Sequence, residues 1–360
     1  MISSLASWAV PAGASGSTDA WQVIASGLDN PRGIDPAPFG TLLVAEAGRG
    51  GTTDCQDGIN PETGATQTSC LGNTGAVDLL VGTHKFKLAT LPSVAAQDGT
   101  SASGPTHATL ANTGLMVSMM GAEPLPFAGD MSKFGKLLRL GFRGPVVAAD
   151  PGAFEAASNP DGNQIDSDPY GLAPSRDGVV MTDAGGNSVI QIDRRGNISL
   201  LAALPSQDAI APPFLGLPEG ATIPSESVPT SITRGPDGAW YVGELTGFPF
   251  QEGLARVWRI VPGHAPTVFG TGFTNIIDLQ FDRHGNLFVL EMAKHGLLQA
   301  GDPSGDPSGA LTKIDRHGVR TEIASAGLIL PGGVAIDAWD HIYVTNKSIF
   351  PGAGEVIRIR

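Results

Sequence analysis

The chain repeats one pattern of apolar and polar positions along its length. A short strand-like run follows a turn, a Gly- or Asp-rich turn comes next, and a second run alternates apolar and polar residues before a small polar or acidic residue. The clearest copy runs from Pro229-Thr-Ser-Ile-Thr-Arg-Gly-Pro-Asp-Gly to Tyr241-Val-Gly-Glu244. Alternation with a period of two predicts β-strands with one buried face. Six copies are present, and they begin near positions 31, 105, 169, 229, 275 and 331.

Two further strand-like runs follow several of the copies, separated by Asp-Gly, Arg-Gly and His-Gly turns. The pairs span 188–193 with 197–204, 255–261 with 266–271, and 309–315 with 319–324. Four short strands per repeat are typical of a propeller blade, so we predict an all-β, six-bladed β-propeller. The copies are spaced by about 60 residues, more than the 40–50 of a plain blade. We therefore expect enlarged loops at 48–75, 121–133, 150–168, 206–228 and 300–308.

The two ends of the chain predict how the ring closes. The last copy has only three strands, ending at 355–360, and a fourth strand-like run is found at 21–28. The run Ile24-Ala-Ser-Gly-Leu28 also resembles the blade junction Ile323-Ala-Ser-Ala-Gly-Leu328. We predict that the N-terminal strand completes the C-terminal blade, which removes free sheet edges. This gives one domain over 21–360, preceded by a disordered leader or signal remnant at 1–20.

The composition narrows the classes of partner. The 49 glycines and 28 prolines supply the turns that many short strands need, and the net charge is −13. An acidic surface argues against nucleic acid and anionic membranes as partners. No run reaches the roughly 18 apolar residues of a membrane span. No phosphate-binding loop, dinucleotide fingerprint, nucleophile elbow or His-Glu-x-x-His helix occurs, so we expect no nucleotide cofactor and no serine-nucleophile hydrolase.

The two cysteines indicate the compartment. Cys55 and Cys70 lie in one polar stretch, 48–75, and we predict that they form a disulfide across a surface loop. Such a bond suits an oxidising compartment, so we expect a secreted or extracytoplasmic protein. Two free thiols are the alternative. The first twenty residues contain no Lys or Arg, so the basic start of a signal peptide is missing.

Aligning the six copies places acidic residues around the predicted axis. The column from the first strands contains Gly33, His107, Gly171, Ser231, Asp278 and Gly333, and the column from the second strands contains Glu46, Met119, Asp183, Glu244, Glu291 and Asn346. Carboxylates brought together repel one another unless a cation neutralises them. Oxygen-rich sites suit Ca²⁺ or another hard divalent cation. We predict that such an ion is held by Glu46, Glu244, Glu291, Asp278, Asn346 and Asp183.

Each of these residues also has a simpler interpretation. An acidic or amide side chain that ends a second strand can fix the blade by accepting hydrogen bonds from neighbouring backbone. His107 is predicted to contact a ligand, with a satisfied polar residue as the alternative. Asn275, Phe248 and Phe250 are predicted as further ligand contacts, although the two aromatic rings would equally cover the end of the core.

One loop outside the two columns is rich in oxygen atoms. It runs over 159–168 and contains three Asp residues and two Asn residues. It lacks the Gly and the terminal Glu of an EF-hand loop, since Gln164 and Tyr170 occupy those places. We interpret it as an Asx-turn loop, with calcium binding as the alternative.

Several phrases together resemble the ScyD/ScyE family. They include Gly27-Leu-Asp-Asn-Pro-Arg-Gly, Val44-Ala-Glu-Ala-Gly-Arg-Gly-Gly51, Thr182-Asp-Ala-Gly-Gly-Asn and Tyr241-Val-Gly-Glu-Leu-Thr-Gly-Phe-Pro. The blades are more distantly similar to NHL-repeat propellers and to gluconolactonase-like calcium propellers. The ScyD/ScyE family is associated with biosynthesis of scytonemin, an extracellular sunscreen pigment of cyanobacteria. The resemblance therefore implies a propeller, export and an accessory role in secondary metabolism, without naming a reaction.

Three functional hypotheses follow from the sequence. The first is a secreted propeller, most simply a monomer, that binds a small polar ligand or a divalent cation at an acidic axial site. The second is a divalent-metal-dependent hydrolase, lactonase or lyase acting at the same site. The third is a protein–protein interaction scaffold that uses the enlarged loops.

Overall fold

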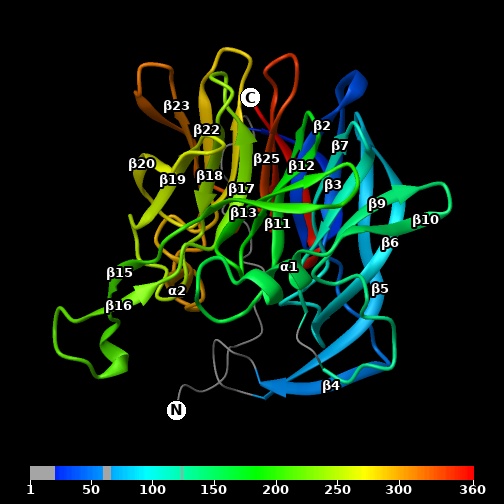
Figure 1. Ribbon diagram of the computed structural model, residues 1–360, viewed down its shortest axis with the longest axis horizontal. Helices are drawn as coiled ribbons and strands as arrows, with labels where there is room; N and C mark the ends of the chain where they lie inside the picture. Colours follow the sequence, from blue (N-terminus) through cyan, green and yellow to red (C-terminus); the bar gives the residue numbers. More distant parts are fainter. Residues whose placement is uncertain (1–20, 60–65, 123–124) are drawn as a thin grey trace.

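The computed structural model describes residues 21–59, 66–122 and 125–360. Twenty-four strands form six four-stranded blades around one axis, as predicted, and the innermost strands are β2, β7, β11, β17, β21 and β25. Each innermost strand contacts the innermost strands of the two neighbouring blades, and β25 contacts β2, so the ring is closed (Figure 1). The predicted leader, 1–20, lies outside the described residues.

The blades follow the predicted repeats closely. Within every blade, neighbouring strands pair antiparallel in sequence order, except where the ring closes. Blade 1 contains β2 (Pro31–Ala37), β3 (Thr41–Glu46), β5 (Thr66–Val81) and β6 (His84–Ala96). Blade 2 contains β7 (Pro105–Ala111), β8 (Gly114–Met119), β9 (Leu137–Gly141) and β10 (Gly144–Ala149). Blade 3 contains β11 (Pro169–Ser175), β12 (Gly178–Asp183), β13 (Ser188–Asp193) and β14 (Ile198–Ala203).

The remaining blades close the ring as the sequence predicts. Blade 4 contains β17 (Pro229–Arg234), β18 (Trp240–Glu244), β19 (Ala255–Ile260) and β20 (Thr267–Phe273). Blade 5 contains β21 (Ile276–Phe281), β22 (Leu287–Glu291), β23 (Ala310–Ile314) and β24 (Arg320–Ala324). Blade 6 contains β25 (Gly333–Ile336), β26 (Ile342–Asn346), β27 (Pro351–Ile359) and β1 (Trp21–Asp29). The N-terminal strand β1 pairs with β27 from Trp21 opposite Ile359, so it is the outermost strand of the C-terminal blade.

The core consists of apolar layers between adjacent blades. Trp240 and Trp258 of blade 4, for example, pack against Val180 and Val189 of blade 3. Similar clusters fill the other interfaces, because each blade is apolar on both faces. Strands that are buried on both faces have nearly continuous apolar runs, as the second strands Gly178–Asp183 and Leu287–Glu291 do.

The insertions gather at one end of the ring. We call this end the entry face, because each innermost strand begins there and each second strand ends there. It contains the helices α1 (Pro151–Ser158) and α2 (Leu297–Ala300), the hairpin of β15 (Gln207–Ile210) with β16 (Thr222–Ser225), and β4 (Asp54–Ile59), which all lie toward the lower end of Figure 1. Two 3₁₀ turns, at Pro38–Gly40 and Pro213–Leu215, complete the elements.

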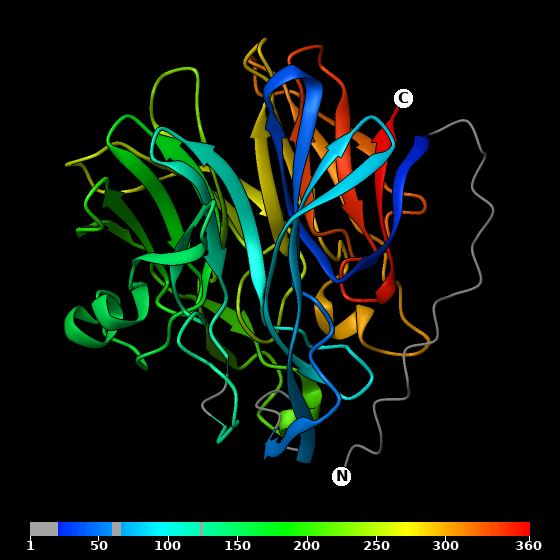
Figure 2. The same ribbon diagram turned by 90° about the vertical axis from the view of Figure 1, so that its right-hand side faces the viewer.

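The disulfide predicted between Cys55 and Cys70 is present. It joins directly opposed residues of β4 and the first part of β5. The enlarged loop expected at 48–75 is therefore largely a β-hairpin that extends blade 1 beyond the ring, visible at the bottom of Figure 2. Among the helices of the described residues, none has the length and apolar content that crossing a bilayer requires.

Candidate functional site

The polar residues that end the second strands point along their own blades. In blade 1, Glu46 Oε1 lies 3.1 Å from Lys85 Nζ, and the same ammonium lies 3.3 Å from Asp78 Oδ2. Burial, with Asp78 as a hydrogen-bond partner, raises the pKa of Glu46 to about 7. Lys85 and Asp78 belong to the outer strands β6 and β5, so this network extends away from the axis.

Glu244 shows the same orientation with more partners. Its side chain is fully buried and accepts hydrogen bonds from Ser227 Oγ at 2.7 Å and from Trp258 Nε1 at 2.6 Å. Arg256 Nε donates to Oε2 and Arg256 Nη2 to Oε1, each at 2.8 Å. This bidentate ion pair, with the guanidinium 4.5 Å from the Trp258 ring centroid, uses both carboxylate oxygens within blade 4.

One rule covers five of the six positions in this column. Each acceptor receives a hydrogen bond from the segment that leads into its own blade, within four residues of the first strand. The donors are Asp29 N for Glu46, Asp168 N for Asp183, Ser227 Oγ for Glu244, Thr274 N for Glu291 and Ile329 N for Asn346, at 2.5–2.8 Å. Met119 of blade 2 has no such acceptor and is a buried core residue. In these five blades the column residue therefore binds the entry segment of its own blade, in agreement with the simpler interpretation given above.

The first-strand column forms a tight ring with close contacts between neighbouring blades. A methyl group placed on Gly33 would lie 2.3 Å from His107 Nδ1, so the imidazole occupies the space that the glycine leaves free. Asp278 Oδ2 accepts a hydrogen bond from Val334 N of blade 6 at 2.8 Å. Burial lowers the pKa of His107 to about 4 and raises that of Asp278 to about 7.

The position before this column places different chemistry on the axis. Arg32 and Tyr170 are the second residues of β2 and β11, and a register shift follows the first residue in five of the six innermost strands. A β-bulge of this kind breaks the period of two and re-aims a side chain. Arg32 is only 9 % exposed, its Nη2 donates to Ala102 O at 3.1 Å, and its Nε has no partner among the described residues.

Tyr170 connects Arg32 to an apolar cluster that spans the entry face. The cluster contains Tyr170 of blade 3 and Ile277 and Met292 of blade 5, with Met120 and Leu245 packed against it. Burial raises the pKa of the Tyr170 phenol, which lies within electrostatic reach of Arg32 and Asp278. The cluster therefore draws residues from several blades at the entry face. Among the described residues, Arg32 and Tyr170 thus place a guanidinium and a phenol beside this apolar cluster, with the Asp278 carboxyl within electrostatic reach of the phenol.

The remaining predicted ligand contacts lie elsewhere on the entry face. Asn275 is fully buried, donates through Nδ2 to Leu245 O at 2.6 Å and accepts from Leu297 N of α2 at 2.9 Å. Phe248 is 40 % exposed and makes edge-to-face contacts with Phe214 at 6.2 Å and Phe250 at 6.5 Å between ring centroids. Neither Phe248 nor Phe250 belongs to the axial cluster. The structure therefore does not bring these residues together with His107.

The predicted metal ligands do not form one group. Within the part of the chain that the structure describes, no set of three or more His, Cys, Asp or Glu side chains is arranged to hold a metal ion. The hydrogen bonds described above tie these side chains to segments of their own blades.

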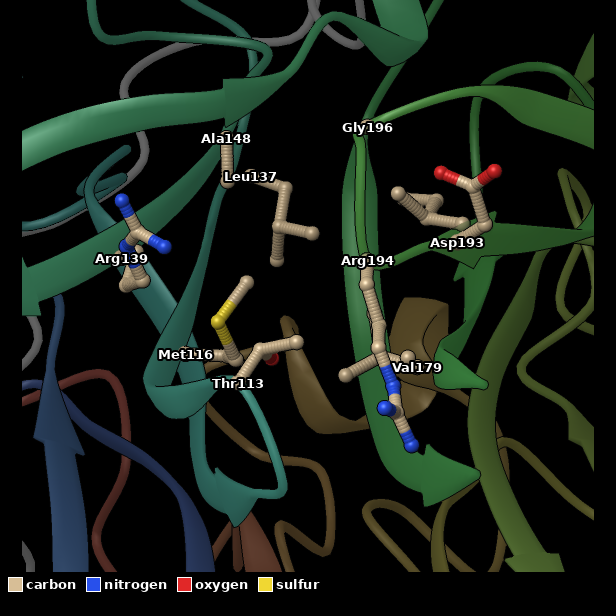
Figure 3. Close-up of a pocket in the computed structure, with 11 residues that line it drawn as sticks. Thr113, Met116, Leu137, Arg139, Ala148, Val179, Asp193, Arg194 and Gly196 are labelled. Atoms are coloured by element: carbon tan, nitrogen blue, oxygen red, sulfur yellow. The ribbon is translucent and has the colours of Figure 1, made fainter. Parts of the chain in front are cut away.

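Two hollows in the surface add little to the axial site. One lies between blades 2 and 3 and is shown in Figure 3, where Met116 and Leu137 face Val179. Its volume is about 20 Å³, which is room for about one water molecule. The other, of about 440 Å³, is an open depression on the entry face lined by apolar residues, including Met131 and Phe134, with Lys136 at its side.

Comparisons with known proteins support the fold. No protein-family model matches the sequence, and no curated protein matches it. Solved structures do match. A calcium-binding regucalcin from Agrobacterium tumefaciens is 12% identical over 94% of this chain and 92% of that chain, with a TM-score of 0.51. A glucose dehydrogenase is 12% identical over 94% of this chain and 99% of that chain, also with a TM-score of 0.51. A gluconolactonase from Xanthomonas campestris is 12% identical over 95% of this chain and 98% of that chain, with a TM-score of 0.48. The chain is similar to gluconolactonase- and regucalcin-like six-bladed propellers in fold.

Proposed function

We propose that the protein binds a small molecule at the axis of the propeller, through an acidic or hydroxyl group on that molecule that accepts hydrogen bonds from Arg32. The observation that carries this is the nearly buried guanidinium, which makes one hydrogen bond and leaves Nε without a partner. A buried donor without an acceptor is costly, and a ligand acceptor would remove that cost. A guanidinium also matches the planar geometry of a carboxylate.

The surroundings of Arg32 define the rest of the ligand. Ligand sites in proteins are mostly apolar, with a few polar groups that set orientation. Tyr170, Leu245, Met292 and Met120 provide such an apolar surface, and the Tyr170 hydroxyl provides a second polar group. We infer that the ligand has an apolar or aromatic body and one anionic or hydroxyl group. The axis is therefore a site for a small polar molecule rather than for a bare cation.

We also propose that the protein acts outside the cytoplasm, which the Cys55–Cys70 disulfide supports. The resemblance to the ScyD/ScyE family supports a role beside secondary-metabolite biosynthesis, with the protein carrying or presenting an intermediate. The lactonase hypothesis is compatible with the fold, but no observation favours it over binding.

A matched set of ligands and variants tests the axial site. Small aromatic and aliphatic carboxylates are screened by thermal shift, each paired with its neutral amide, against the native protein, Arg32→Gln and Tyr170→Phe. Arg143→Gln is the control, because Arg143 is exposed on the β9–β10 turn. We expect carboxylates to stabilise the native protein and the control, and amides to do so much less. If every stabilising compound acts equally on Arg32→Gln, the proposal fails.

A further inference from the structure

The helix α1 places one carboxylate in an unusual environment. Asp150 caps the helix by accepting a hydrogen bond from Ala153 N at 2.9 Å, and Pro151 begins it. One turn later, Glu155 points into the molecule, where it is 1 % exposed. Neither of its carboxylate oxygens has a hydrogen-bond partner among the described residues. A buried carboxylate with no donor is strongly unfavourable unless a proton or a cation neutralises it.

The groups around Glu155 are themselves acidic. Asp161 and Asp166 come from the loop that follows α1, and Asp183 ends β12. Burial and the charges of Asp183, Asp161 and Asp166 together raise the pKa of Glu155 to about 7. Over residues 21–59, 66–122 and 125–360, no Lys, Arg or His side chain forms an ion pair with any of these four carboxylates. The positive charge that this pocket needs is therefore not provided by the protein.

A glycine turn shapes the pocket. A methyl group on Gly186 would lie 2.5 Å from Glu155 Oε2, and one on Gly185 would lie 3.0 Å from Asp166 Oδ2. Both carboxylates thus approach the same turn more closely than any side chain would permit. Gly186 N also donates to Asp183 Oδ1 at 3.2 Å, which ties this turn to the third carboxylate.

The loop contributes several oxygen atoms near Glu155, and one of them has no hydrogen-bond partner among the described residues. Asn159 ends α1 in a left-handed conformation, and its Oδ1 is buried without a hydrogen-bond partner. Asp166 is exposed, and its Oδ1 accepts a hydrogen bond from the adjacent Ser167 N at 2.8 Å. Asp161 holds Asn163 N in an Asx turn at 3.0 Å, so part of the loop is the Asx-turn structure predicted from the sequence.

We propose that a calcium-class divalent cation binds in this pocket, with Glu155 as its central ligand and Asn159 Oδ1, Asp161 and Asp166 as further oxygen ligands. The carboxylates are not already arranged as a three-ligand group in the described residues. Binding therefore draws the exposed side of the loop toward Glu155. Ca²⁺ suits this better than Mg²⁺, since it accepts six to eight oxygen ligands in flexible geometry.

Calcium chloride is the probe, and the full chain is used. Protein stripped with EDTA is melted at pH 8 with and without Ca²⁺, and binding is measured by titration calorimetry. We expect Ca²⁺ at about a hundredfold above its dissociation constant to raise the Tm by about 3 °C or more. Glu155→Gln is expected to abolish the shift and the calorimetric signal. In EDTA its Tm is expected to be no lower than that of the native protein, because the amide needs no counter-charge.

Three further variants make the outcome specific. Glu219→Gln, at an exposed turn, is the matched control and is expected to keep the full calcium shift. Gly186→Ala inserts a methyl group against Glu155 and is expected to weaken binding at least tenfold. Asp166→Asn changes an exposed ligand, so it folds even where a core variant does not, and it is expected to weaken binding as well.

Two results would overturn the proposal. Native protein that shows neither a calcium shift nor calorimetric binding would mean that Glu155 is neutralised by a proton. A calcium shift that Glu155→Gln and Asp166→Asn both retain would place the ion elsewhere. Neither result bears on Arg32, because the axial site uses different residues.

Discussion

Replacement of Glu244 by Ala tests the structural role that the structure gives to the second-strand column. The substitution leaves the Arg256 guanidinium without its bidentate partner and removes the acceptor for Trp258 Nε1 and Ser227 Oγ. Breaking a buried ion pair by removing one partner costs about 3–5 kcal/mol. We therefore expect a loss of about 4 kcal/mol in the free energy of unfolding.

That loss converts into a modest change in melting temperature. The entropy of unfolding is about 2.1 cal/mol/K per residue, which for a chain of 360 residues is about 0.76 kcal/mol/K. A loss of about 4 kcal/mol then lowers the Tm by about 5 °C. Scanning calorimetry measures this directly, in EDTA and in CaCl₂, with Glu219→Ala as the exposed control.

The comparison of the two buffers separates the structural role from metal binding. Because both Glu244 oxygens already hold protein donors, we expect the variant to lose the same 5 °C in either buffer. A loss below about 2 °C would refute the hydrogen-bond argument. A loss seen only in CaCl₂ would instead assign Glu244 to a metal.

Three further predictions follow from the fold and its buried acids. Burial raises the pKa values of Glu155, Asp168 and Asp278 to about 7, above the usual 3.8–4.5. The native state therefore binds more protons than the unfolded chain between about pH 4 and pH 7. Their stabilising contribution is complete below pH 4 and is lost as the pH rises through 7. In EDTA the Tm should therefore fall from pH 5 to pH 7.5, and a rising Tm would contradict these assignments. Reducing the Cys55–Cys70 bond should lower the Tm by at most about 4 °C, since closing a 15-residue loop contributes about 3 kcal/mol. The far-UV circular dichroism spectrum should stay unchanged, and loss of the whole spectrum would count against a local role of the disulfide. Deleting residues 1–29 removes β1 and exposes the edge of β27, so the shortened protein should aggregate. A protein that lacks only residues 1–20 should melt like the full protein. Equal solubility of the two shortened proteins would contradict closure of the ring by β1.

The blades could be predicted because their signal is local. Alternating apolar residues and Gly- or Asp-containing turns occur within each copy, and strands such as Ser188–Asp193 have the predicted bounds. The closing strand was also predictable, since Trp21–Leu28 supplies the one run that the last copy lacks. The hairpin of β4 and β5 was expected only as a loop, because its polar composition resembles that of a loop.

Side-chain direction was the part that the repeat alignment could not supply. The alignment assumes a regular period of two, but register shifts at the start of the innermost strands break that period at Arg32 and Tyr170. Nor does any local pattern in the sequence show that Glu155 lacks partners, because that depends on the turn at Gly185 and Gly186, some thirty residues later. Both candidate sites thus depend on contacts between distant segments.

Titration calorimetry of the best carboxylate from the axial screen tests the central claim most directly. We predict one site per chain in the native protein and in Arg143→Gln. Binding to Arg32→Gln should be about ten- to a hundredfold weaker, which corresponds to the loss of a charge-assisted hydrogen bond worth about 1.5–3 kcal/mol. Equal affinity in the native protein and Arg32→Gln would show that the axis does not bind ligands through this guanidinium.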